Sequence, residues 1–327
     1  MELEVLEHYL GPISELLKSS DITEIMVNRW NEVFIERSGV FERVDVSFSS
    51  DHEVALLIGQ VASSSGGAEA TVDRDPVVNA RLPDGSRFCG VLSPWSVKGS
   101  MFSIRKFPDE LLTIKDLVSK GSLTDEMSEY LQDEMRHRKN VIVSGSTSSG
   151  KTTVVNALGA FIDPNERVVT VEDTEELKFE HVKNWVPLVS HNRVMDVGAQ
   201  EVGLSSFITT ALRLNPDRIF VGEIRESSAA IAFIRGINTG HDGCVTTIHA
   251  NSPLDAMYRL IGEVSASGVP MAFAEQQVWR NVNLVIQVKK LPAVGRRVTA
   301  ISQIDDGIVR DVFVFDEGLG RHVRCST

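Results

Sequence analysis

The sequence predicts an α/β protein in which a mostly parallel sheet carries helices on both faces, together with a smaller α/β domain. Between residues 141 and 248, short apolar runs typical of buried strands alternate with helical patterns, and this alternation is characteristic of βαβ units. The chain has 327 residues, which is enough for about two domains of ordinary size. An apolar fraction of 42% and a charged fraction of 24% are ordinary for a globular protein.

The smaller domain is expected over residues 1–107. Asp51 is placed to cap its helix, which would end in the Ser/Gly stretch 63–67, and Ser38-Gly39 and Pro83-Asp84-Gly85-Ser86 supply turns between strands. Periodicity and β-branched residues predict one helix over 51–61 and strands over 22–27, 32–36, 41–45, 77–82, 87–92 and 100–107.

A polar helical stretch after Pro108 predicts a linker or crossover over residues 108–135. The larger domain then covers residues 136–327, where the expected strands are 141–144, 167–172, 218–222, 243–248, 283–289, 297–304 and 310–315. Helices over 151–161, 205–214 and 226–236 separate the first four strands, which implies parallel pairing.

A phosphate-binding motif, G-x-x-x-x-G-K-[ST], follows the first strand of the larger domain and precedes its first helix. It consists of Gly145, Ser146, Thr147, Ser148, Ser149, Gly150, Lys151 and Thr152, and Thr153 follows on the same helix. Backbone N–H groups of such a loop cradle phosphates at the positive end of the helix. The lysine reaches the β- and γ-phosphates, and the threonine hydroxyl can bind Mg²⁺. A Gly/Ser-rich surface turn could fit the same pattern, but the flanking strand and helix favour a nucleoside triphosphate site.

Three further clusters of polar residues stand next to expected strands. Glu172 and Asp173 stand where one strand ends, Glu223 follows another, and a segment that contains His241 and His249 ends the fourth. Because parallel strands bring their carboxyl ends to one edge, we expect these clusters to converge on the phosphate loop. Glu223 is the candidate that polarises the attacking water, and His249 is the candidate that contacts the γ-phosphate. Glu172 or Asp173 could hold the water shell of Mg²⁺.

Structural explanations compete with each of these roles. Glu223 could be a solvated acid paired with Arg225, Asp173 could cap a turn, and His241 could be an ordinary loop histidine. The position before Glu223 is Gly222, where many phosphate-loop enzymes carry an aspartate that supports the metal. The sequence therefore leaves the metal-supporting residue open between Glu172 and Asp173.

Charge and cysteine content argue against several other classes of protein. With 33 basic and 45 acidic residues, the net charge is −12, which argues against a protein that mainly grips nucleic acid. Lys289-Lys290 and Arg296-Arg297 form a local basic cluster, which is best explained as a solvated strand edge. Three scattered cysteines argue against disulfide and zinc frameworks and for a reducing compartment. The N-terminus is acidic and does not resemble a signal sequence.

Together these motifs resemble the bacterial secretion and pilus traffic ATPases of the type II/type IV secretion superfamily, in particular the conjugal-transfer (TrbB-like) and pilus-assembly (CpaF-like) branches. Residues 145–152 match the Walker A motif of that family, and residues 172–174 match its aspartate box. Residues 222–225 match its atypical Walker B, in which glycine before the glutamate is normal, and residues 240–252 match its histidine box. In the first domain, residues 21–28, 80–87 and 103–107 are similar to the family's N-terminal domain.

The resemblance implies a RecA-like P-loop ATPase domain behind a smaller, PAS-like N-terminal domain. It implies a cytoplasmic homohexamer, peripherally docked on an inner-membrane secretion or pilus platform, with ATP and Mg²⁺ as ligands. Arg87 and Arg105 of the first domain would then reach the phosphates, and His241 would belong to the nucleotide site. Arg213 and Arg225 match family positions that contact nucleotide or a neighbouring subunit. Direct binding of nucleic acid is not expected.

Three other functions fit parts of the sequence. A RecA-like translocase or helicase would handle nucleic acid directly, although the acidic balance argues against it. A non-hydrolysing nucleotide switch could act as an assembly scaffold. A small-molecule P-loop kinase would leave the first domain without a role. Which machine is served, and with what cargo, is not encoded in any of these motifs.

Overall fold

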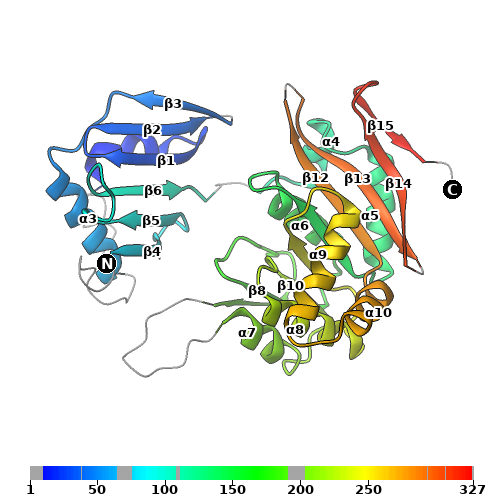
Figure 1. Ribbon diagram of the computed structural model, residues 1–327. Coiled ribbons are helices and arrows are strands. Elements are labelled where there is room, and N and C mark those ends of the chain that lie inside the picture. The colour runs from blue at the N-terminus through cyan, green and yellow to red at the C-terminus, as the bar shows by residue number, and fades with distance from the viewer. Residues whose placement is uncertain are drawn as a thin grey trace. The chain divides into compact units, whose positions relative to one another are not determined.

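The computed structural model describes residues 10–37, 39–64, 76–107, 111–190, 203–292, 294–305 and 307–325. The described residues divide into two compact units, each built on its own sheet (Figure 1). Those up to Phe107 form the first unit, and those from Leu111 onwards form the second. Ser38, residues 65–67 and Pro108, to which the sequence assigned a turn, a helix end and a linker start, lie outside the described residues.

The first unit is a six-stranded antiparallel sheet with one long helix on a face. The strand order is β3-β2-β1-β6-β5-β4. The elements are a short 3-10 helix η1 (Gly11–Ile13), α2 (Ser14–Lys18), β1 (Ile22–Arg29), β2 (Glu32–Arg37), β3 (Val40–Val44), α3 (Asp51–Ser64), β4 (Val77–Arg81), β5 (Arg87–Val91) and β6 (Met101–Arg105). The strands and helix expected here from periodicity are all present.

The core of the first unit follows from that periodicity. Alternate residues of β1 and β2 are buried, because a strand turns successive side chains to opposite faces. α3 packs Val54, Leu57, Ile58 and Val61 onto the same face, at the i, i+3, i+4, i+7 spacing of an amphipathic helix.

The second unit is a nine-stranded sheet in the order β15-β14-β13-β12-β7-β11-β10-β8-β9. β12, β7, β11, β10, β8 and β9 are parallel, and the last three strands of the chain add to them antiparallel. Its strands are β7 (Val141–Gly145), β8 (Arg167–Glu172), β9 (Asn184–Val189), β10 (Arg218–Val221), β11 (Val245–Ile248), β12 (Leu284–Leu291), β13 (Gly295–Asp305), β14 (Ile308–Asp316) and β15 (Arg321–Arg324).

Helices cover both faces of this sheet, as the sequence predicts (Figure 1). One apolar core lies under α4 (Ile114–Ser119), α5 (Asp125–Arg136) and α6 (Lys151–Gly159). The other lies under α7 (Leu204–Ala211), α8 (Ser227–Asn238), α9 (Pro253–Ala266) and α10 (Met271–Asn281). The segment expected to be a linker thus carries two helices, α4 and α5, whose buried Leu117, Met127 and Leu131 belong to the second unit's core.

The sequence did not predict β9, β15, α9 or α10. None of the helices among the described residues is both long enough and apolar enough to span a bilayer.

Candidate nucleotide-binding site

The phosphate loop joins β7 directly to α6. β7 is buried along its whole length and ends at Gly145, and α6 begins at Lys151. Two residues of the loop have left-handed backbone conformations, Ser148 with φ 58° and Gly150 with φ 103°. Glycine is required at position 150 because residues with a Cβ rarely adopt such a φ. The sequence therefore builds the strand–loop–helix context that a phosphate-binding loop needs.

The Lys151 side chain is folded back over the loop. Its Nζ donates to the carbonyl oxygens of Gly145 at 3.2 Å and Ser146 at 3.1 Å, and it lies 3.3 Å from Nδ1 of His249. Only 8% of the residue is exposed. A buried ammonium must be paired with acceptors, and here carbonyl dipoles and an imidazole nitrogen serve as the acceptors.

Glu223 and His249 stand beside the lysine at the same edge of the sheet. Oε1 of Glu223 lies 2.6 Å from Nε2 of His249, and its Oε2 accepts a 2.8 Å hydrogen bond from Arg225. The backbone N–H of Ile224 donates to the Thr247 carbonyl at 2.9 Å, which holds this segment against β11. The two side chains come from different strands and meet because both strands end at this edge.

The protonation state of the His249 ring determines how it interacts with Lys151 and Glu223. Burial lowers the pKa of His249 below its ordinary value, and the Lys151 ammonium acts in the same direction, while the Glu223 carboxylate opposes both. The ring is therefore neutral near pH 7. In the tautomer that carries its proton on Nε2, Nδ1 accepts from Lys151.

Glu172 and Asp173 stand at the end of β8 with different surroundings. Asp173 accepts from the Ser190 hydroxyl at 3.0 Å and lies 3.7 Å from Nη1 of Arg225. Glu172 is only 3% exposed, and its carboxylate accepts from the backbone N–H groups of Glu176 at 3.0 Å and Leu177 at 3.2 Å. Glu172 thus fixes the loop that follows β8.

Burial raises the pKa of Glu172 to about 8, against the opposing effect of the two backbone N–H groups. Gly222 is part of the same packing. A Cβ on Gly222 would lie 3.0 Å from Cγ of Glu172, closer than side chains normally approach. An aspartate at position 222 would add a second carboxylate to this buried site. Glycine at position 222 thus leaves Glu172 space that a larger residue would reduce.

The raised pKa of Glu172 predicts a pH dependence of stability. The folded state holds the proton more tightly than the unfolded state, so this contribution is complete below the ordinary pKa of 4.5 and is lost as the pH rises through about 8. In protein free of nucleotide and Mg²⁺, we expect the unfolding free energy of the wild type to fall over this range relative to Glu172→Gln, at about 1.4 kcal/mol per unit of pKa difference. Urea denaturation at a series of pH values measures it. If the unfolding free energies of the two proteins change in parallel with pH, the pKa of Glu172 is not raised in the folded state.

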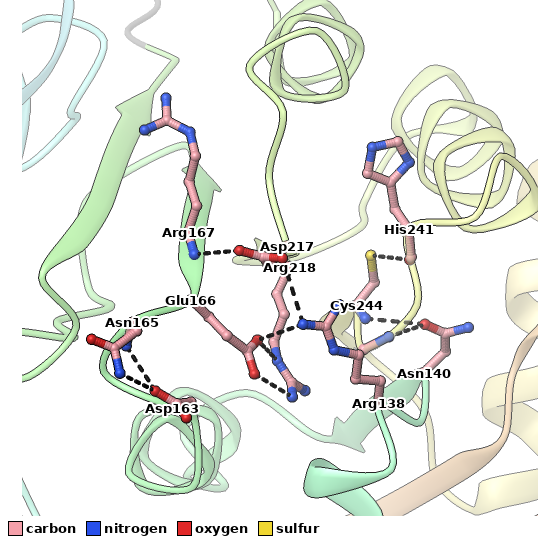
Figure 2. Close-up of polar contacts among 11 residues, drawn as sticks. Arg138, Asn140, Asp163, Asn165, Glu166, Arg167, Asp217, Arg218, His241 and Cys244 are labelled. Carbon is pink, nitrogen blue, oxygen red and sulfur yellow. Dashed lines mark hydrogen bonds and ion pairs between the residues drawn. The ribbon is translucent and has the colours of Figure 1, made fainter.

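Two predicted site residues lie at the opposite edge of the sheet. His241 precedes β11, and Arg213 precedes β10, whereas the phosphate loop follows β7. Since the three strands are parallel, residues that enter β10 or β11 are separated from the loop by the length of a strand. Figure 2 shows His241 in a cluster of polar residues at this opposite edge, where its carbonyl accepts from the buried Cys244 thiol. The expectation that His241 converges on the phosphate loop of its own chain is therefore wrong.

The same cluster supports the strand ends. The Asn140 side-chain oxygen accepts from the backbone N–H groups of Gly243 and Cys244 at 3.0 Å each, and the buried Arg218 guanidinium is paired with Glu166 (Figure 2). These contacts tie the amino ends of β7, β8, β10 and β11 together.

Arg87 and Arg105 belong to the first unit, where they are directly opposite each other on β5 and β6. Two arginines of the second unit contact the site although the sequence assigned them no such role, one at the phosphate loop and one at His249. Arg296 donates to the Ser148 carbonyl at 3.1 Å, and Arg259 donates to the His249 carbonyl at 3.0 Å. The basic cluster at 289–297 was the available signal for Arg296, but a strand-edge explanation accounted for it equally well.

Known proteins are similar to this chain in sequence and in fold. The family model of the type II/IV secretion system proteins matches residues 7–302. A probable conjugal transfer protein TrbB of Sinorhizobium fredii is 34% identical over 297 residues, covering 88% of this chain and 85% of that protein. The type IV secretion system protein VirB11 of Bartonella quintana is 30% identical over 285 residues, covering 77% and 78% respectively.

A crystal structure of the pilus retraction motor PilT with bound ADP has the same fold. Its TM-score is 0.63 at 22% identity, over 92% of this chain and 82% of PilT. The family match extends over nearly the whole chain and includes all four motifs. The chain therefore belongs to the type II/IV secretion system protein family, the secretion and pilus traffic ATPases that its motifs resemble.

Proposed function

We propose that this chain hydrolyses ATP with Mg²⁺ at the phosphate loop and uses the cycle to power a type IV secretion, conjugation or pilus assembly machine. The observation that carries the proposal is the line of contacts from Lys151 through His249 to Glu223, with separations of 3.3 Å and 2.6 Å. It joins the lysine expected at the β- and γ-phosphates to the carboxylate expected to act on water.

Each residue has a distinct task in this proposal. Lys151 exchanges the loop carbonyls for phosphate oxygens, which accept stronger, charge-assisted hydrogen bonds. Glu223 orients and polarises the attacking water, because a carboxylate beside a phosphate loop can accept its proton. Neutral His249 contacts both Lys151 and Glu223. When the γ-phosphate is lost, His249 would transmit that change to Glu223.

The donor set fits Mg²⁺. The ion prefers oxygen ligands and usually keeps several waters, using one or two carboxylates together with substrate phosphates. Thr152 stands at the start of α6, and Glu172 and Asp173 stand at the end of β8, at the edge where the loop lies. When bound, the ion would neutralise charge that develops on the phosphate oxygens. We propose Thr152 as a direct ligand and Asp173 or Glu172 as the support of its water shell.

The working form in this proposal is a homohexamer in the cytoplasm, bound to a platform at the inner membrane. The names of TrbB, VirB11 and PilT, which refer to conjugal transfer, type IV secretion and pilus retraction, support this class of machine. Arg87, Arg105 and Arg225 would contact the nucleotide. Arg213 and His241 would do so only in the site of a neighbouring subunit, because they enter β10 and β11 at the opposite edge.

Measuring mass and turnover together tests the proposal. With a non-hydrolysable ATP analogue and Mg²⁺, light scattering should give six times the chain mass of 36.0 kDa. A separate sample of the same preparation, given ATP and Mg²⁺ without the analogue, should release phosphate. Hexamers that bind ATP but release no phosphate, even with membrane fractions added, would indicate a nucleotide-switched scaffold. ATP-dependent, salt-sensitive affinity for single-stranded nucleic acid would indicate a translocase.

A further inference from the structure

A basic hairpin projects beside the phosphate loop. β12 runs parallel to β7 until Val288 pairs with Gly145, and it continues for three residues beyond that point before β13 returns. In this projecting part, Lys289 is directly opposite Arg297, and Lys290 is directly opposite Arg296. Like charges in direct cross-strand pairs destabilise a sheet. The repulsion between these pairs calls for a compensating interaction. Protection of a strand edge by lysines does not explain why basic residues stand directly opposite each other.

Arg296 makes such an interaction with the phosphate loop. Its Nε donates to the Ser148 carbonyl at 3.1 Å, and its Cδ would be 3.3 Å from a Cβ placed on Gly150. The side chain thus lies along residues 148–150, the two ends of which have the left-handed φ values of 58° and 103°. A serine pays an energetic cost for this conformation, and a charge-assisted bond to its carbonyl favours it.

We propose that Arg296 is a positioning residue for the phosphate loop, which it holds from outside in the conformation that turns its N–H groups toward phosphate. This inference rests on the proposed role of the loop in binding nucleotide. Because the contact is made by a residue of the same chain, it favours the ordered loop conformation and lowers the entropic cost of ordering the loop on phosphate binding.

The position of the hairpin explains why the contact can persist during turnover. β7 lies between β12 and β11 in the sheet. Glu223 and His249, which define the γ-phosphate end of the site, follow β10 and β11 on one side of β7. Arg296 approaches from β13 on the other side, so it does not compete with Lys151 or Glu223 for the terminal phosphate.

The test compares Arg296→Ala with Lys289→Ala in the full chain. Both variants remove one positive charge from the same exposed hairpin, but no contact of Lys289 with the loop exists among the described residues. We expect Arg296→Ala to weaken binding of ADP and of inorganic pyrophosphate by the same factor, about three- to tenfold, with kcat changed less than about twofold. Lys289→Ala should stay within about twofold of wild type throughout, and Arg296→Lys should lie between.

Hydrogen exchange of the peptide that spans residues 145–151 gives an independent readout in nucleotide-free protein. Arg296→Ala should speed exchange there and leave β10 and β11 unchanged. Unchanged exchange in the loop would overturn the proposal even if ATP turnover fails for other reasons. Equal losses of ADP and pyrophosphate affinity in the two alanine variants would mean that Arg296 acts only through its positive charge, which would overturn the proposal. Loss of ADP binding with normal pyrophosphate binding would mean that Arg296 contacts the nucleoside.

Discussion

Glu223→Gln is expected to reduce steady-state ATP hydrolysis by about a hundredfold or more, with ATP affinity within a few-fold of wild type. The amide keeps the size and shape of the side chain but accepts a proton from water poorly. The carboxylate contacts His249 and Arg225, so we expect the phosphate-binding groups of the loop to keep their function when it is lost. Phosphate release and calorimetric titration with ATP measure the two effects on one preparation.

Glu226→Gln is the matched control for this prediction. Glu226 is an exposed carboxylate three residues further along, at the start of α8, and its side chain makes no capping hydrogen bond there. It should turn over ATP at the wild-type rate. If Glu223→Gln releases phosphate as fast as this control, Glu223 does not activate the attacking water.

Lys151→Ala should abolish both hydrolysis and tight binding. The ammonium is the cation whose donors already reach the loop carbonyls, and we expect the same donors to bind the β- and γ-phosphates. Loss of charge-assisted bonds to a polyanion is expected to weaken ATP and ADP binding by about a hundredfold or more. Fluorescence titration with a labelled nucleotide measures the affinity.

Lys139→Ala tests whether any such loss is specific. Lys139 is half-buried and precedes β7, at the other end of the strand from the phosphate loop. Both variants should unfold at temperatures close to that of the wild type. Tight nucleotide binding by a folded Lys151→Ala protein would contradict the position given to the phosphates.

The phosphate loop and the acids at the strand ends were predictable because buried parallel strands are continuous apolar runs. Val141, Val168 and Phe220 are all fully or nearly fully buried, and polar residues follow each of these strands. β9 escaped prediction because Pro187 interrupts its pattern. Proline removes a ladder donor and is confined to edge strands, and β9 is the edge of its sheet.

Other parts of the site depend on tertiary structure alone. The contact between Arg296 and Ser148 joins residues 148 positions apart, and no local pattern encodes it. His241 and His249 are eight residues apart in one motif, but β11 lies between them and carries them to opposite edges. The residue type of Glu172 suggested a role at the metal ion. Its burial and its hydrogen bonds from two backbone N–H groups show that it also organises the following loop.

The most direct test of the central claim, that the phosphate loop and Glu223 act on the same polyanion, is a crystal structure of Glu223→Gln with ATP and Mg²⁺. We predict that Nζ of Lys151 leaves the carbonyls of Gly145 and Ser146 for the β- and γ-phosphates, and that the residue 223 side chain faces the γ-phosphate across one water. A γ-phosphate directed away from residue 223 and His249, toward β12, would contradict the account.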